Sequence, residues 1–207
     1  MNNFRTSEIT VNGLRFKTLS GGPVSGELVL FLHGFPEFGD AWQPVMVPTA
    51  ELGFHAVAVD QRGYSGGARP DDVSDYGIEH LLSDIRGFAD TLGYRRFHLV
   101  GHDWGAFLAW AFAAEHSDRV QSLSALSTPH PNAFFNAMET EEDQMRRSQY
   151  IAFFKMSNGA AEQFFQADNH QRLRAVYQGS PAQSTNNFSP GRCSCRSTRS
   201  SWRLQRW

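Results

Sequence analysis

Lysine is almost absent from this chain of 207 residues, which has only Lys17 and Lys155 among its 19 basic residues. Cysteine is equally scarce. Cys193 and Cys195 are the only two, and a pair separated by one residue makes no disulfide framework. No histidine or further cysteine stands near them at ligand spacing, so the pair is a weak metal signal. We therefore expect no metal site and no cofactor.

The sequence also lacks a strong charge and a long apolar run. Its formal net charge of −2 gives no electrostatic reason to expect nucleic acid or an anionic membrane as a partner. No apolar run approaches the roughly 20 residues that a membrane span needs. The first ten residues lack the charged-then-apolar order of a secretory signal. We expect a cytoplasmic protein without nucleic-acid or membrane partners, and the sequence does not indicate its oligomeric state.

Strand and helix patterns alternate along the first two thirds of the chain. Residues 4–19 alternate in polarity around Asn12-Gly13, a strong signal for a two-stranded hairpin. Residues 28–32 form a continuous apolar run, which is typical of a strand buried on both faces of a parallel sheet. Further strands are predicted at residues 55–60, 97–100 and 120–127, and helices at residues 78–92 and 104–116. This order predicts an α/β fold with a mostly parallel sheet.

One short segment, Gly101-His102-Asp103-Trp104-Gly105, lies between a predicted strand and a predicted helix. Two glycines that flank one reactive residue at such a turn form the pattern of a nucleophile elbow. Without a Cβ on either side, the backbone can turn sharply and the central side chain projects alone. The central residue is Asp103, and a carboxylate can attack carbon to form an ester. The alternative is an aspartate that only caps the helix.

The last third of the chain divides into two parts of different character. Residues 132–178 are helical and aromatic, and they predict a partial helical cap over a core of residues 1–131, or else an ordinary helical tail. Residues 179–207 predict a non-native or disordered tail, because residues 180–207 contain no acidic residue and many arginines and serines. Out-of-frame reading of a GC-rich gene gives this composition. The alternative is a basic tail that stacks on nucleic-acid bases.

Three motifs occur in order at the ends of predicted strands: His33-Gly34-Phe35-Pro36, Asp-Gln-Arg-Gly-Tyr-Ser at residues 60–65, and the segment around Asp103. With these motifs and Ser-Thr-Pro-His-Pro at residues 127–131, the chain from about residue 4 to 178 resembles an epoxide hydrolase of the α/β-hydrolase fold. That branch uses an Asp nucleophile and is near the haloalkane dehalogenases. The resemblance implies that Asp103 attacks an epoxide carbon of a small apolar substrate and forms an alkyl-enzyme ester.

The same resemblance implies roles for the neighbouring residues. The backbone N–H groups of Phe35 and Trp104 are expected to form the oxyanion hole that ester hydrolysis requires. Tyr150 matches a cap tyrosine that protonates the epoxide oxygen, although it could also be an ordinary core tyrosine. Four supporting residues complete the predicted site. They are His33, which braces its loop, with Gly34, Pro36 and His102.

The chain also departs from the family pattern. The family's general base is a histidine near its C-terminus, and none of the eight histidines here matches it. A second cap tyrosine and the last core strands are also missing, so we expect a truncated or frameshifted chain that forms the ester but turns over little. Two alternatives stay open. One is a haloalkane dehalogenase, which usually carries Asn where Phe35 stands, and the other is a non-catalytic ligand-binding remnant.

Overall fold

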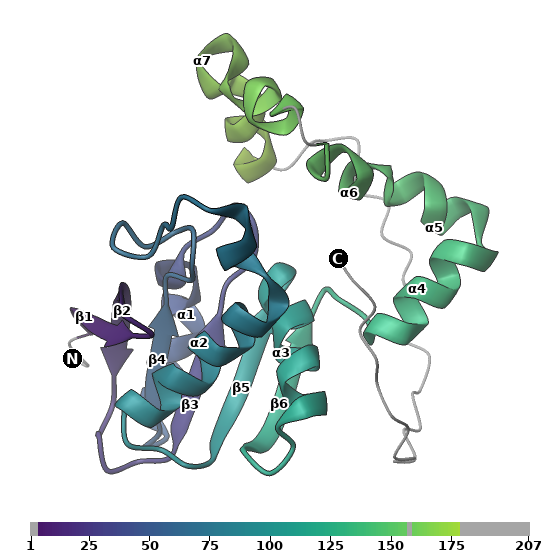
Figure 1. Cartoon of the computed structure of the whole chain (residues 1–207). Coiled ribbons are helices and arrows are strands. Elements are labelled where there is room, and N and C mark those ends of the chain that lie inside the picture. The colour runs from purple at the N-terminus through teal and green to yellow at the C-terminus, as the bar shows by residue number, and fades with distance from the viewer. Residues whose placement is uncertain (1–3, 157–158, 179–207) are drawn as a thin grey trace. The chain divides into compact units, whose positions relative to one another are not determined.

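The computed structural model describes residues 4–156 and 159–178, which form two compact units with the division at residues 133 and 134. The predicted tail at 179–207 lies outside the described residues. The first unit contains a six-stranded sheet (Figure 1). Its strands are β1 (Arg5–Val11), β2 (Leu14–Gly21), β3 (Leu28–Leu32), β4 (His55–Val59), β5 (Phe97–His102) and β6 (Val120–Leu126). Its helices are η1 (Gly39–Trp42), α1 (Gln43–Glu51), η2 (Val73–Tyr76), α2 (Ile78–Thr91) and α3 (Trp104–Glu115).

The sheet has the order β1-β2-β4-β3-β5-β6. β1 and β2 form the predicted antiparallel hairpin around Asn12-Gly13, and β2 pairs antiparallel with β4. The pairs β3–β4, β3–β5 and β5–β6 are all parallel. The mostly parallel sheet predicted from the sequence is therefore confirmed. The carboxyl ends of its parallel strands meet at one edge, where ligands bind in open α/β sheets.

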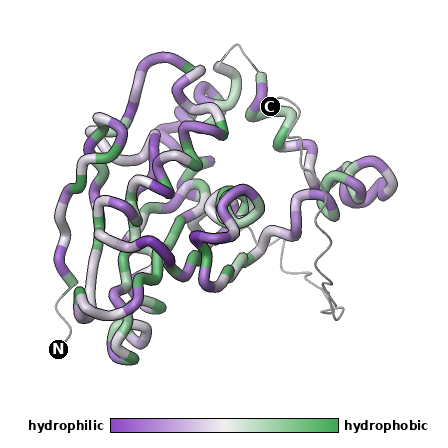
Figure 2. The backbone as a smooth tube through the Cα atoms, turned by 60° about the horizontal axis from the view of Figure 1, so that its bottom comes forward, coloured by the Kyte–Doolittle hydropathy of each residue, from purple (hydrophilic) through white to green (hydrophobic). Residues whose placement is uncertain are grey.

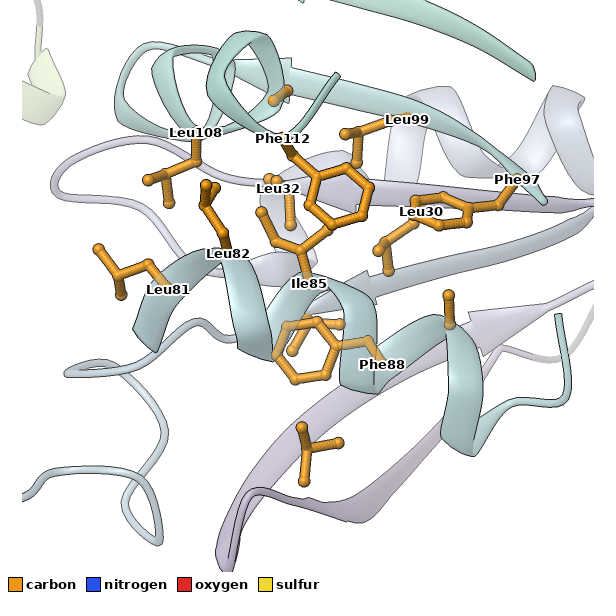
Figure 3. Close-up of a cluster of buried hydrophobic side chains, with 14 of the residues drawn as sticks. Leu30, Leu32, Leu81, Leu82, Ile85, Phe88, Phe97, Leu99, Leu108 and Phe112 are labelled. Atoms are coloured by element: carbon orange, nitrogen blue, oxygen red, sulfur yellow. The ribbon is translucent and has the colours of Figure 1, made fainter. Parts of the chain in front are cut away.

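Helices cover both faces of the sheet. α2 and α3 pack their apolar side chains onto one face in a core cluster that includes Ile85, Phe88 and Phe112 (Figure 3). α1 covers the other face, where Met46 and Phe31 are buried together. Every residue of β3 and β4 is buried. This double coverage explains the continuous apolar runs that predicted these two strands.

Helix α1 was not predicted from the sequence. It begins at Gln43 with Pro44 in its first turn and carries a second proline, Pro48, inside it. Proline is tolerated in the first turn but removes a hydrogen bond further along a helix, so the sequence did not indicate nine helical residues. Burial of Met46 and Ala50 against the sheet overrides that weak local preference.

Strand β6 lies at the edge of the sheet. Within the described part of the chain it pairs only with β5, and its residues alternate between half-buried and exposed. Exposed backbone groups on such an edge can pair with another chain.

The described residues of the second unit form helices and no strand, as predicted, and these helices contain both hydrophobic and hydrophilic stretches (Figure 2). They are α4 (Pro131–Thr140, which begins in the first unit), α5 (Glu142–Arg147), α6 (Gln149–Phe154) and α7 (Ala160–Gln178). α7 is interrupted at residues 167–170, where three consecutive residues have positive φ angles. In the described part of the chain, no helix combines the length and the apolar character that crossing a bilayer requires.

Candidate active site

Asp103 lies at the turn between β5 and α3, at the carboxyl edge of the sheet. Its backbone angles are φ 51° and ψ −118°, outside the regions that non-glycine residues normally occupy. Local hydrogen bonds hold this conformation. The Asp103 N–H donates to the carbonyl of Leu126 at 3.1 Å, and the Asp103 carbonyl accepts the N–H groups of Ala106 and Phe107 at 3.0 and 3.1 Å. Strained backbone of this kind concentrates at functional sites.

The two glycines around Asp103 are required by close backbone contacts. A Cβ on Gly101 would lie 2.3 Å from the carbonyl oxygen of Gly105. A Cβ on Gly105 would lie 2.3 Å from the carbonyl oxygen of Leu32 in β3. Neither position leaves room for a methyl group. The strand, turn and helix predicted from the Gly-x-Asp-x-Gly pattern are therefore present, with both glycines at close backbone contacts.

The loop after β3 presses directly on Asp103. A Cβ on Gly34 would lie 2.5 Å from the Asp103 Cβ. The next backbone N–H, that of Phe35, donates to Asp103 Oδ1 at 3.0 Å. Within the described residues, the other carboxylate oxygen, Oδ2, accepts no hydrogen bond. The Phe35–Pro36 peptide is cis. The structure thus brings Gly34 and Phe35 to the predicted nucleophile and leaves one of its oxygens open.

The two predicted oxyanion-hole residues carry aromatic side chains. Phe35 is 40% exposed and Trp104 is 41% exposed. The Trp104 indole stacks on Phe107, with ring centroids 5.2 Å apart and an interplanar angle of 10°. As the first residue of α3, Trp104 has a backbone N–H without a partner in its own helix. Its use as the second oxyanion donor stays a prediction.

His33 is fully buried beneath this loop. Its Nε2 accepts the Gln61 N–H at 3.1 Å, so Nδ1 carries the proton and donates to the Gly34 carbonyl at 2.9 Å. Burial lowers the pKa of His33, which favours the neutral ring. The Gln61 side chain also donates to the His33 carbonyl at 2.6 Å. Both ring nitrogens are occupied, which supports the predicted bracing role.

Glu37 contacts His102 at the site, and the sequence did not predict this contact. His102 directly precedes Asp103, and its Nδ1 lies 3.3 Å from Glu37 Oε2. Since a carboxylate only accepts hydrogen bonds, Nδ1 is the donor. The contact joins the loop after β3 to the end of β5. Glu37 follows the His-Gly-Phe-Pro motif directly in the sequence, which is the one signal that could have indicated it.

Thr128 is a second site residue to which the sequence analysis assigned no role. Its hydroxyl donates to the Asp103 carbonyl at 2.9 Å, and its own carbonyl accepts the indole N–H of Trp110 at 3.3 Å. Thr128 belongs to the segment 127–131, which the sequence singled out without a role. It therefore ties the residues after β6 to the turn that carries Asp103.

The motif at residues 60–65 anchors the surrounding loops. Arg62 Nε donates to Asp84 Oδ2 at 2.7 Å and Nη2 donates to Oδ1 at 2.9 Å, with both side chains at most 5% exposed. The hydrogen bonds to Asp84 raise the pKa of Arg62. Asp60 Oδ1 accepts the Gly39 N–H at 2.7 Å. These contacts fix the loops after β3 and β4 at the sheet edge that carries Asp103.

Tyr150, the predicted acid, lies on α6 in the second unit and is 56% exposed. Its ring meets Phe154 edge to face, with centroids 6.1 Å apart. Because it belongs to the other unit, its action on the same substrate as Asp103 stays a prediction. Among residues 4–156 and 159–178, no cluster of three or more His, Cys, Asp or Glu side chains could hold a metal ion.

Two proteins of similar sequence are epoxide hydrolases. Epoxide hydrolase 2 of Caenorhabditis elegans is 33% identical over 182 residues, which cover 88% of this chain and 51% of that protein. Epoxide hydrolase 3 of Xenopus tropicalis is 39% identical over 145 residues, 70% of this chain and 39% of that protein. The chain thus spans about half the length, or less, of these two relatives.

A solved structure that resembles this chain is also that of an epoxide hydrolase. The crystal structure of a Bacillus megaterium epoxide hydrolase in complex with an inhibitor superposes with a TM-score of 0.76 at 36% identity. The superposition covers 84% of this chain and 61% of that one. The sequence model described as "alpha/beta hydrolase fold" matches residues 27–205, which is most of the chain. The chain therefore belongs to the α/β-hydrolase fold family, and the three similar proteins compared with it are epoxide hydrolases.

Proposed function

We propose that this chain is an epoxide hydrolase in which Asp103 is the nucleophile. The hydrogen bond from the Phe35 N–H to Asp103 Oδ1 is the observation that carries the proposal. It fixes one carboxylate oxygen and leaves Oδ2 to attack. The positive φ of Asp103 adds support, because the turn holds this side chain at the sheet's carboxyl edge at the expense of backbone strain.

In the first step, Asp103 Oδ2 forms a bond to an epoxide carbon while that carbon's bond to the ring oxygen breaks. The released oxygen takes a proton, which we assign to the Tyr150 hydroxyl by resemblance to the cap tyrosines of epoxide hydrolases. A positioned acid of this kind contributes about 100- to 10,000-fold in rate. The product is an alkyl ester on Asp103. The apolar side chains of Phe35 and Trp104 suit a small apolar substrate.

The second step is hydrolysis of this ester. Water adds to the ester carbon, and negative charge develops on Oδ1, to which the Phe35 N–H already points. The bond from this carbon to Oδ2 then breaks, which releases the diol and restores the Asp103 carboxylate. The backbone N–H of Trp104 is the second donor in this proposal. Such preorganised donors contribute most where the charge develops.

Hydrolysis also needs a general base to activate water. His33 is unsuited to the task, because both of its ring nitrogens are engaged in the buried loop. None of the other histidines matches the position of the general base in epoxide hydrolases. We therefore propose that the ester on Asp103 forms faster than it is hydrolysed.

Haloalkane dehalogenation is the second candidate, since a carboxylate can also displace a halide from carbon. Phe35 offers no polar side chain to hold a departing halide, whereas that branch usually has Asn there. The three similar proteins reported above are all epoxide hydrolases. A cytoplasmic location stays a prediction from the sequence.

Incubation of the intact chain with styrene oxide tests the proposal by mass spectrometry. We expect a mass gain of one substrate molecule and little diol. A variant in which Cys193 and Cys195 are replaced by serine removes the competing thiols and should retain the adduct. Asp103→Asn in that background should show none, and Tyr150→Phe should form it at least about 100-fold more slowly. An unmodified mass with intact circular dichroism would refute the nucleophile assignment.

A further inference from the structure

Three polar side chains form a connected group at the other end of the sheet. Glu27 directly precedes β3, His98 lies near the start of β5, and Ser122 lies in β6. His98 is the register partner of Ser122, and Val29, two residues after Glu27, is paired with His98 on its other side. Asp103 follows His98 by five residues along β5, which places the two roughly 16 Å apart at about 3.3 Å per residue.

The three side chains are joined by two hydrogen bonds. Ser122 Oγ lies 2.7 Å from His98 Nδ1, and His98 Nε2 lies 3.1 Å from Glu27 Oε2. The carboxylate can only accept, so Nε2 carries the proton of the neutral ring. Nδ1 then holds a lone pair, and the Ser122 O–H donates to it. A hydroxyl on a base that is oriented by a third group is the arrangement of an activated nucleophile.

Neighbouring residues hold this hydrogen-bonded group of three side chains in place. Gln121 Nε2 donates to the second oxygen of Glu27 at 3.4 Å, and Phe54 meets the His98 ring edge to face at 5.6 Å. The hydrogen bond from His98 lowers the pKa of Glu27, with a smaller contribution from Gln121, and keeps this carboxylate ionised. The pairing of β5 with β6 skips Gln121 at a β-bulge. Bulges of this kind re-aim side chains.

The serine is open to reagents. Ser122 is exposed, and the side chains of His98 and Glu27 are 23% and 60% exposed. Each of the three residues therefore combines a defined hydrogen bond with access from solvent. Ser124, two residues further along β6, is exposed as well, but His98 bonds to Ser122. Ser124 is therefore a matched control, an exposed serine outside the group.

We propose that Ser122, His98 and Glu27 form a second nucleophilic site, at which activated esters acylate Ser122. The site is separate from Asp103 and does not depend on the proposed function. Ser122 Oγ forms a bond to the acyl carbon, and its proton moves to His98 Nδ1. Glu27 stabilises the resulting imidazolium through Nε2–H. The bond from the acyl carbon to the leaving oxygen breaks, and the leaving group departs as a phenolate, while acyl-Ser122 remains.

The test uses p-nitrophenyl acetate on the full chain, with release of p-nitrophenolate and peptide mapping as readouts. Trypsin yields a peptide of residues 120–146, which contains both Ser122 and Ser124. We expect one acetyl group at Ser122, none in Ser122→Ala, and full labelling in Ser124→Ala. His98→Gln should slow the labelling by about 100-fold, the lower end of what a positioned base contributes. Glu27→Gln, at an exposed side chain, should slow it while the fold is retained.

Two results would overturn the proposal. One is labelling of Ser124 to the same extent as Ser122. The other is an Ser122 labelling rate that is unchanged in both His98→Gln and Glu27→Gln, which would make Ser122 only an exposed hydroxyl. Alkylation of Asp103 by styrene oxide is measured separately on Ser122→Ala and should be retained, so failure at one site is distinguishable from failure at the other.

Discussion

Substitution of Gly34 by alanine should impair the chemistry of Asp103 far more than it impairs the fold. The added Cβ would lie 2.5 Å from the Asp103 Cβ and 2.8 Å from Oδ1. Carbon atoms in contact are normally about 3.5–4.0 Å apart, so the loop and the carboxylate must separate by roughly 1 Å. Overpacking of this size costs about 1–3 kcal/mol of stability. A 1 Å misplacement of reacting groups costs about 100-fold in rate.

The assay is the initial rate of adduct formation on the intact chain with styrene oxide. Gly66→Ala is the matched control, because a Cβ on Gly66 meets no atom within 4 Å. We expect Gly34→Ala to be about 100-fold slower than the natural chain and Gly66→Ala to match it, with both variants folded by circular dichroism. Adduct formation by Gly34→Ala at the natural rate would show that the contact between this loop and Asp103 does not position the nucleophile.

Two further predictions concern the stability of the first unit. Asp84→Ala should lower the free energy of unfolding by about 3–5 kcal/mol, because it leaves the buried Arg62 guanidinium without its carboxylate, whereas Asp143→Ala on the exposed surface should leave the urea midpoint unchanged. Equal effects of the two substitutions would contradict this. Burial lowers the pKa of His33 and of His55, so below about pH 6.5 the unfolded chain binds protons that these folded residues do not. Stability should therefore decrease as the pH is lowered from about 7.5 to about 5.5. A urea midpoint that stays constant over that range would show that neither ring is held neutral.

The central strands of the sheet could be predicted from the sequence because they are short and buried on both faces. The run at residues 28–32 was predicted with the bounds that the structure shows, and the strand from His55 ends one residue earlier than expected. Because these strands are buried on both faces, their apolar residues form continuous runs that mark them in the sequence. Helix α1 could not be predicted, because Pro44 and Pro48 weaken the local signal and tertiary packing decides it.

The site could be predicted as far as local patterns reach. The turn at Asp103 follows from two flanking glycines, and the approach of Phe35 follows from the meeting of strand ends at one edge. The contact between His102 and Glu37 could not be inferred, since 65 residues separate the two in sequence. The Thr128 hydroxyl bond to the Asp103 carbonyl spans 25 residues and leaves no periodic trace either.

The central claim is that the Asp103 carboxylate itself attacks the epoxide, and the site of the adduct tests it most directly. After reaction with styrene oxide, trypsin releases a peptide of residues 97–119, which contains Asp103 and no cysteine. Fragmentation of this peptide locates the added mass. We predict one adduct on Asp103, absent from Asp103→Asn. An adduct on a histidine of the same peptide, with Asp103 unmodified, would contradict the account.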